Sequence, residues 1–294
     1  MKKLTNLSLT VLLSLAVLFM AACGGGEKKE SGSSSAEFEQ AKAELEENVK
    51  KVLHEIPSPA EIPFKLQAAG ADFNEGLIND IEKIDSYASM SDKAIINLGI
   101  YSTDIGYLSS YEKTQESLTY MRSCRKLADN LGLSSSFSAD LLNEFEENIE
   151  SRDSLATLVN ETIANAENLL REDDRGNLAA LMITGSFVEG LYLGTQIVDN
   201  YPTDLGEDVV NMILSDLIRT IIDQEKPLDD LITMLEGADQ NDRVTSILGS
   251  LQDVKAAFEG VDLDGMIERQ ETPSAGTIKG ITDSIAALRG DLTS

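Results

Sequence analysis

The sequence predicts an all-α fold, in which a multi-helix bundle or helical array surrounds a buried central helix at about 177–199. Apolar residues recur with a period near 3.6 along nearly the whole chain, and strictly alternating runs of Val, Ile and Thr do not occur. The stretch at 177–199 is apolar on all sides, which is typical of a buried helix. We expect a flexible tether to precede the helices.

The expected helices are joined by short linkers, which favour antiparallel neighbours. A sparse apolar stripe predicts the first helix at 36–56. Ser58-Pro59-Ala60-Glu61 is a capping box with proline at the first helical position, so a short helix should begin there and end at Gly70. The remaining helices are expected at about 76–87, 91–110, 112–131, 138–149, 155–170, 177–200, 206–223, 227–235, 244–258 and 275–288.

The first 35 residues differ in composition from the rest of the chain. Lys2 and Lys3 give a positive start, Leu4 to Met20 carries no charge, and small residues follow. This order is that of a secretory signal peptide, and the apolar stretch is too short for a comfortable membrane span. Residues 24–35, GGGEKKESGSSS, are typical of a flexible linker.

Met20-Ala21-Ala22-Cys23 resembles the lipobox of bacterial lipoproteins, with Met where Leu is usual. The resemblance implies removal of residues 1–22, a diacylglycerol group on the Cys23 thiol and a fatty acid such as palmitate on its new amine. Two or more acyl chains hold a protein stably on a membrane. In that family an Asp after the cysteine favours the inner membrane, so Gly24 implies the outer membrane of a two-membrane cell. The domain would lie in the periplasm or at the cell surface.

Residues 36–294 would then form a single all-α domain. The polar run 171–175 allows two helical halves with a boundary near 171–176. An acid-x-x-Tyr-Leu pattern occurs at Asp104 and again at Glu189, which leaves open an internal repeat relating 94–111 to 179–196. Glycines in these two helices cost helix propensity, and close helix approach is their expected use. They are Gly99, Gly106, Gly185, Gly190 and Gly194.

The charge balance restricts the possible partners. The chain has 51 acidic residues against 24 Lys and Arg, for a net charge of −27. Such a chain repels phosphate backbones and anionic headgroups, so we expect no nucleic-acid binding and contact with the membrane through the N-terminal lipid alone. A basic protein partner or a small cationic ligand would be attracted.

Few residues favour catalysis or metal binding. With Cys23 lipidated, Cys124 has no disulfide partner, and a buried apolar role is expected for it. His54 is the only histidine, so catalytic triads, Cys–His pairs and His-based zinc sites are not expected. Asp262-Leu263-Asp264-Gly265 lacks the further acids of a calcium loop and is read as a turn or cap. The sequence therefore predicts no metal and no cofactor.

Two acids are alone within apolar helices, Asp104 and Glu189. Burying a bare carboxylate is costly, so each should be protonated, hydrogen-bonded or paired, and tyrosine hydroxyls, Arg122 and Arg125 are the candidate partners. These acids have either a structural role or a place in a ligand cavity. The tyrosines that would line such a cavity with them are Tyr101, Tyr107, Tyr111 and Tyr192.

Three classes of function remain. The preferred class is a membrane-anchored lipoprotein of the cell envelope with a non-enzymatic interaction or structural role. The alternatives are a helical binding protein for a small cationic or polar ligand, and an enzyme that uses carboxylates. A cleft in which Asp104, Glu189 and the tyrosines converge would favour ligand binding. A transmembrane helix at 178–198 is disfavoured because Glu189 would lie at its centre.

Overall fold

The computed structural model describes residues 40, 43–45, 47–49, 61–68, 70–148, 151–172, 175–202 and 206–294. Every regular element within these ranges is a helix, and they contain no strand, so the all-α prediction is confirmed. The predicted signal peptide, Cys23, the tether, His54 and most of the predicted 36–56 helix lie outside the described residues. Lys42–Ser294 forms one compact unit.

The long helices occupy the expected ranges. In chain order the elements are α3 (Glu61–Ala68), η1 (Glu75–Leu77), η2 (Ile81–Lys83), α4 (Ile84–Tyr87), α5 (Ser91–Ser110), α6 (Thr114–Asn130), α7 (Ala139–Glu147), α8 (Arg152–Glu172), α9 (Gly176–Asp199), α10 (Glu207–Ile222), α11 (Glu225–Glu236), α12 (Asp242–Glu259), α13 (Leu263–Arg269), η3 (Ala275–Ile278) and α14 (Lys279–Leu292).

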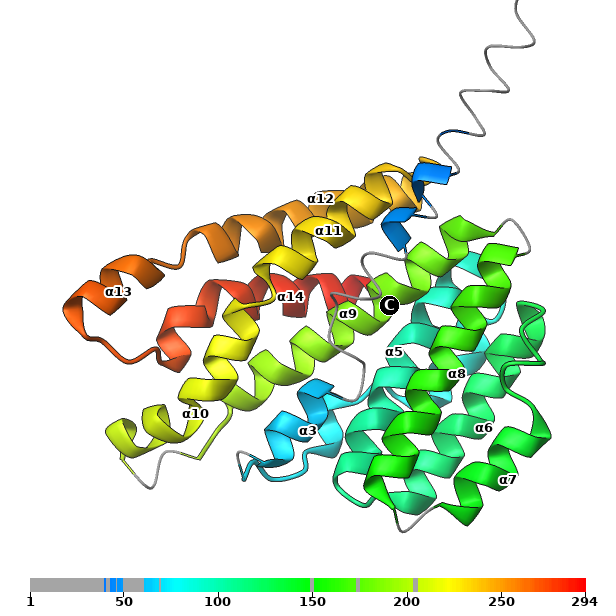
Figure 1. The fold of residues 1–294 in the computed structure, drawn as a ribbon, viewed down its shortest axis with the longest axis horizontal. Helices are drawn as coiled ribbons and strands as arrows, with labels where there is room; N and C mark the ends of the chain where they lie inside the picture. Colours follow the sequence, from blue (N-terminus) through cyan, green and yellow to red (C-terminus); the bar gives the residue numbers. More distant parts are fainter. Residues whose placement is uncertain are drawn as a thin grey trace, which may run out of the picture. The chain divides into compact units, whose positions relative to one another are not determined.

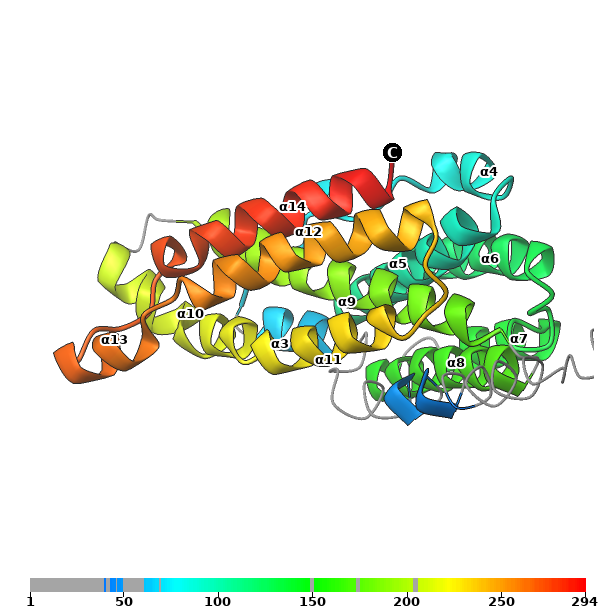
Figure 2. The same cartoon turned by 90° about the horizontal axis from the view of Figure 1, so that it is seen from above.

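Helix α9 is the central helix of this unit. It packs against α3, α5, α8, α10, α11 and α14. Helices α5–α8 lie on one side of it and α10–α14 on the other (Figures 1 and 2). Among the described residues, α9 is the helix long and apolar enough to cross a membrane, but 89% of its apolar window is buried within the protein. The prediction of a buried central helix is confirmed.

Helices α5 and α9 cross with their backbones in contact. A Cβ atom on Gly99 would lie 2.1 Å from the carbonyl oxygen of Met182, and one on Gly185 would lie 2.1 Å from that of Ile96. Ser186 Oγ adds a hydrogen bond of 3.2 Å to the Gly99 carbonyl. Only glycine permits this approach, so the expected use of Gly99 and Gly185 is confirmed.

The predicted helix at 76–87 is wrong. This stretch consists of η1, η2 and the single turn α4. Asn74 Oδ1 accepts from Gly76 N at 3.0 Å, and Asp80 Oδ1 accepts from Glu82 N at 2.9 Å. Side chains of this kind compete with helical hydrogen bonds, so the backbone turns twice instead of continuing as one helix. The resulting segment, 71–83, lies against α5 and α6.

The Asp262 motif was expected to be a turn or cap, and the structure shows the cap. Asp262 Oδ1 accepts from Gly265 N at 3.0 Å at the start of α13. The helix itself was not predicted, because its seven residues include Gly265 and give no clear period. Gln270, with φ of 57°, follows it in the left-handed region.

Candidate functional site

The two predicted acids meet inside the protein. Asp104 of α5 and Glu189 of α9 both have 0% of their surface exposed. Each lies about one turn beyond the glycine at which its helix crosses the other, which brings the carboxyls together at the same level of the interface. The two carboxyls lie close enough for Glu189 to raise the pKa of Asp104. The structure therefore confirms that these acids are buried and adds that they form a pair.

Arg289 of α14 compensates the charge of Glu189. Its Nε lies 3.0 Å from Glu189 Oε2 and its Nη2 lies 3.1 Å from Oε1, which is a bidentate pair. Nη2 also donates to the Leu77 carbonyl at 3.2 Å, and the guanidinium carbon lies 4.7 Å from the centre of the Tyr192 ring. Burial lowers the pKa of Arg289, but the charge of Glu189 and its hydrogen bonds outweigh this, so the net pKa is raised.

Asp104 is best described as the neutral member of the pair. Burial raises its pKa well above the usual value, and the negative charge of Glu189 raises it further, while Arg289 lowers it. Its Oδ2 accepts a hydrogen bond from the backbone N of Asn79 at 3.1 Å, whereas Oδ1 has no hydrogen-bond partner. With a proton on Asp104, the two carboxyls carry a single negative charge, that of Glu189. One carboxylate and one guanidinium then remain, and the interior charges balance.

Of the predicted tyrosines, Tyr101, Tyr107 and Tyr111 form hydrogen bonds with the backbone through their hydroxyls. They fasten segment 71–83 to helices α5 and α6, and burial raises the pKa of each. The bonds are Tyr101 to Asp80 O (2.8 Å), Tyr111 to Ala71 O (2.9 Å), Tyr120 to Asn79 O (2.8 Å) and Asn74 N to the Tyr107 hydroxyl (3.0 Å). The expectation that these hydroxyls donate to the acids is wrong.

Sequence reasoning missed Arg289 and chose other arginines. Arg122 pairs with Glu146 at 2.8 Å, and more than two fifths of each of these side chains is exposed. A signal for Arg289 was present in the sequence. It follows the buried Ile285 by four residues and precedes the buried Leu292 by three, so helical spacing places it at the edge of the buried face of α14.

A small pocket adjoins this cluster without including the acids. Its volume is about 250 Å³, and Leu77, whose carbonyl binds Arg289, forms part of its wall. Phe73, also in the wall, stacks on Tyr107 with ring centres 5.3 Å apart. The lining residues are Ala71, Asp72, Phe73, Asn74, Leu77, Gln196, Ile197, Asn200, Tyr201 and Pro202. Tyr107 and Tyr111 contact Phe73 but do not line the pocket. Asp104 and Glu189 do not line it either.

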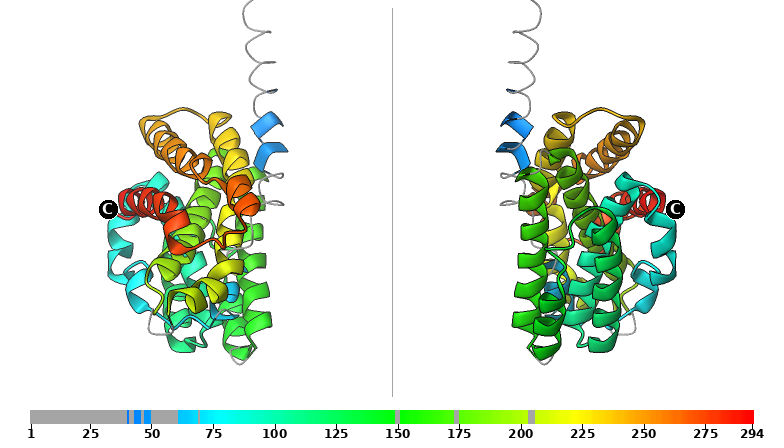
Figure 3. Two further views of the ribbon diagram at one scale, coloured as in Figure 1. Left: turned by 90° about the vertical axis from the view of Figure 1, so that its left-hand side faces the viewer. Right: turned by 90° about the vertical axis from the view of Figure 1, so that its right-hand side faces the viewer.

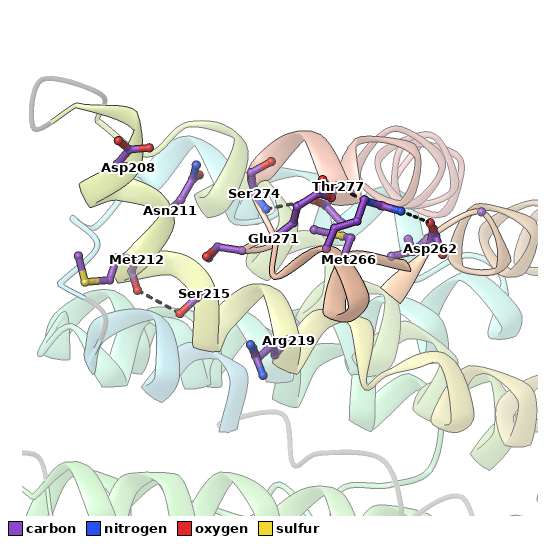
Figure 4. Close-up of a pocket in the computed structure, with 14 residues that line it drawn as sticks. Asp208, Asn211, Met212, Ser215, Arg219, Asp262, Met266, Glu271, Ser274 and Thr277 are labelled. Carbon is purple, nitrogen blue, oxygen red and sulfur yellow. Dashed lines mark hydrogen bonds and ion pairs between the residues drawn. The ribbon is translucent and has the colours of Figure 1, made fainter. Parts of the chain in front are cut away.

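A larger groove of about 930 Å³ lies between α10 and α13 (Figure 4). We call it the α10–α13 groove. Arg269 lies within it and binds Asp262 at 3.2 Å and Glu271 at 3.0 Å. The lining residues are Asp208, Asn211, Met212, Ser215, Arg219, Gly260, Val261, Asp262, Met266, Arg269, Glu271, Thr272, Ser274 and Thr277. None of the residues that the sequence singled out as a ligand site lines this groove.

Within the described residues, no group of three or more His, Cys, Asp or Glu side chains is placed to hold a metal ion. Cys124 is buried, and burial raises the pKa of its thiol. The chain matches no known protein family, no curated protein and no solved structure.

Proposed function

We propose that this chain is a membrane-anchored lipoprotein of the bacterial cell envelope with a non-enzymatic interaction or structural role. Lys2 and Lys3, an uncharged apolar stretch and Met20-Ala21-Ala22-Cys23 support the anchor. Gly24 supports placement at the outer membrane where the cell has two membranes.

The observation that carries the non-enzymatic role is the bidentate pair of Glu189 and Arg289. The acids that could have served catalysis are fully buried, and Asp104 accepts a hydrogen bond from the backbone N of Asn79. No pocket described here is lined by either acid. The charge of Glu189 is compensated by Arg289, and this ion pair joins α9 to α14, which is a structural use.

The anchor is tested by substituting Cys23→Ser in the full chain and labelling cells with a palmitate analogue. The parent should carry the label and fractionate with membranes, while Cys23→Ser should lose both properties. Cys124→Ser is the matched control, because it removes the other thiol and should keep the label. Membrane-bound, processed Cys23→Ser protein would contradict the proposal.

The second candidate is a binding protein for a small cationic or polar ligand. The pocket of about 250 Å³ favours it, because its wall combines the Asp72 carboxylate, the amides of Asn74 and Asn200, and the ring of Tyr201. The Phe73 ring already has Lys113 over it, 4.8 Å from its centre. Acids and rings of this kind attract organic cations. Titration with tetramethylammonium, followed by calorimetry, should then give binding that Asp72→Asn weakens. An unchanged affinity in Asp72→Asn would remove this candidate.

A further inference from the structure

One wall of the α10–α13 groove is a single face of helix α10. Asp208, Met212, Ser215 and Arg219 follow one another at intervals of four, three and four residues, which places them on one side of the helix. Met212 is 68% exposed despite its apolar side chain, and Val209 one turn before is 41% exposed. In the part of the chain that the structure describes, Met90 is the other large apolar residue with this degree of exposure. Two of the three therefore lie together beside this groove, as at interaction sites.

The opposite wall is held in place by interactions of its own. Arg269 is bound by the carboxylates of Asp262 and Glu271, so its charge is already compensated. Gln270 holds the left-handed conformation that turns the chain back after α13, and Glu271 N donates to the Met266 carbonyl at 2.9 Å. Met266 lies in this wall, and Met212 lines the groove from α10 (Figure 4).

The surroundings of the groove are strongly acidic. Asp208, Asp262 and Glu271 line the groove together with Arg219 and Arg269. The two stretches that form its walls, 206–224 and 259–277, carry four more exposed acids at described positions, which are Asp216, Asp223, Glu259 and Glu268. A partner must therefore bring positive charge to this surface. It must also bring apolar side chains, because Met212 and Met266 offer flexible, polarizable surfaces that adapt to a hydrophobic partner.

We propose that the α10–α13 groove binds a basic, amphipathic segment of a partner protein. Apolar side chains of the segment pack on Met212 and Met266, and its cations meet the carboxylates at the rim. A helix that lays its apolar face into a groove is a common form of peptide recognition. A second copy of this chain fits poorly, because each copy carries a net charge of −27. The inference rests on the proposed interaction role and does not depend on the lipid anchor.

The test uses the full chain in detergent and three synthetic peptides of about 14 residues, long enough to present one helical face. The first peptide has Leu and Lys at helical spacing, the second replaces Lys with Glu, and the third contains Lys without Leu. Fluorescence anisotropy should show tight binding of the first peptide, at least about tenfold weaker binding of the third, and none of the second. Equal affinity for the first and third peptides would show that the Leu side chains contribute nothing and that binding depends on charge alone. This result would overturn the proposal.

Matched variants locate the binding site. Met212→Glu should weaken binding of the Leu–Lys peptide by about tenfold or more, since it replaces an apolar anchor with a charge. Met90→Glu makes the same chemical change at another exposed methionine and should leave the affinity unchanged. Similarly, Asp208→Asn should weaken binding, whereas Asp216→Asn, an exposed position on α10 that does not line the groove, should do so less.

Three results would overturn the proposal. The first is an equal effect of Met212→Glu and Met90→Glu on peptide affinity. The second is absence of Leu–Lys binding to a parent protein that remains helical by circular dichroism. The third is concentration-dependent self-association of the parent that Met212→Glu abolishes, which would make a second copy the occupant. Palmitate labelling of Cys23 would be unaffected in each case, so failure here is distinguishable from failure of the proposed anchor.

Discussion

Helices α5 and α9 touch along their backbones, whereas α10 and α13 are separated by a groove. At the crossing, Gly99 and Gly185 remove side chains so that two backbones touch, and the acids beyond them are matched by Arg289. At the groove, Met212 on α10 remains exposed, and no helix of the described residues covers it. The first surface is complete within this chain and the second is not. Substitutions at the crossing should therefore change stability, and substitutions at the groove should change binding alone.

The largest effect is expected from Arg289→Met, which leaves Glu189 buried without its cation. Loss of one member of a buried ion pair costs about 3–5 kcal/mol of unfolding free energy. Chemical denaturation monitored by circular dichroism measures this loss. The double variant Arg289→Met with Glu189→Gln removes both charges and should recover much of it.

Arg243→Met is the control for the Arg289 experiment. Arg243 of α12 pairs with Asp291 of α14 at 2.8 Å, and these side chains are 21% and 50% exposed, against 14% and 0% for Arg289 and Glu189. An exposed pair contributes about 0–1 kcal/mol, so this variant should remain close to the parent. Equal losses in Arg289→Met and Arg243→Met would show that the crossing has no special dependence on its cation.

Glu167 is a further buried acid, and unlike Glu189 it has no arginine bound to both of its carboxylate oxygens. Glu167 of α8 is 1% exposed, its Oε2 has no hydrogen bond, and burial raises its pKa to about 8, with Arg171 lowering it only in part. The unfolded chain would ionise this group near pH 4.3. Its contribution to stability is therefore fully present below about pH 4 and is lost progressively as the pH rises to about 8.

Glu167→Gln should remove this pH dependence. The variant should gain about 2–4 kcal/mol over the parent at pH 8.5 and almost nothing at pH 4, since one pKa unit corresponds to about 1.4 kcal/mol. Denaturation curves at several pH values provide the measurement. Glu161→Gln, at an exposed position of the same helix, should give parallel curves for variant and parent. A gain that is independent of pH would contradict burial of the charge.

A smaller loss is expected from Gly185→Ala. The added Cβ would collide with the Ile96 carbonyl, a backbone atom that can move only with its helix. Overpacking of this kind costs about 1–3 kcal/mol and should lower the melting temperature. Gly249→Ala in α12 is the control, because nothing lies within 4 Å of the new atom. That variant should gain up to about 1 kcal/mol from helix propensity. Two variants that melt together would disprove the close crossing.

The smallest effect is expected at the groove. Met212→Glu alters an exposed side chain and should change the unfolding free energy by less than about 0.5 kcal/mol. Thermal denaturation of Met212→Glu beside the parent checks this. A loss as large as that of Gly185→Ala would show that Met212 belongs to the core.

Most of the fold could be predicted because a helix leaves a local signal in the sequence, the period of its apolar residues. The apolar period gave the long helices, and Ser138 caps α7 as its position indicated, with its Oγ accepting from Leu141 N at 3.2 Å. Segment 76–87 could not be predicted in the same way. Its backbone carbonyls are bound by Tyr101 and Tyr120 from other helices, and such tertiary bonds override local preference.

The candidate site was predicted in part for a similar reason. Asp104 and Glu189 stood out because a lone charge in an apolar helix requires an explanation. Their partners did not, since Arg289 is 100 residues from Glu189 and the Asn79 amide belongs to an irregular segment. The groove left no sequence signal beyond the period of α10, because Met212 resembles any core methionine until the packing is known.

The separation of 100 residues between Arg289 and Glu189 affects the order in which the chain folds. Glu189 is synthesised 100 residues before its cation, and the same stretch of α14 is bound to residues far earlier in the chain. Tyr87 donates to the Thr293 carbonyl at 3.0 Å, and Asn97 donates to that of Leu292 at 3.2 Å. Figure 3 shows the red C-terminal helix beside the cyan elements from early in the chain. Contacts of such sequence separation form late, because the intervening loop must close first. Until α14 docks, Glu189 lacks its cation, so we expect it to remain in water or to hold a proton. Docking of α14 is then expected to be a late step in completing the core.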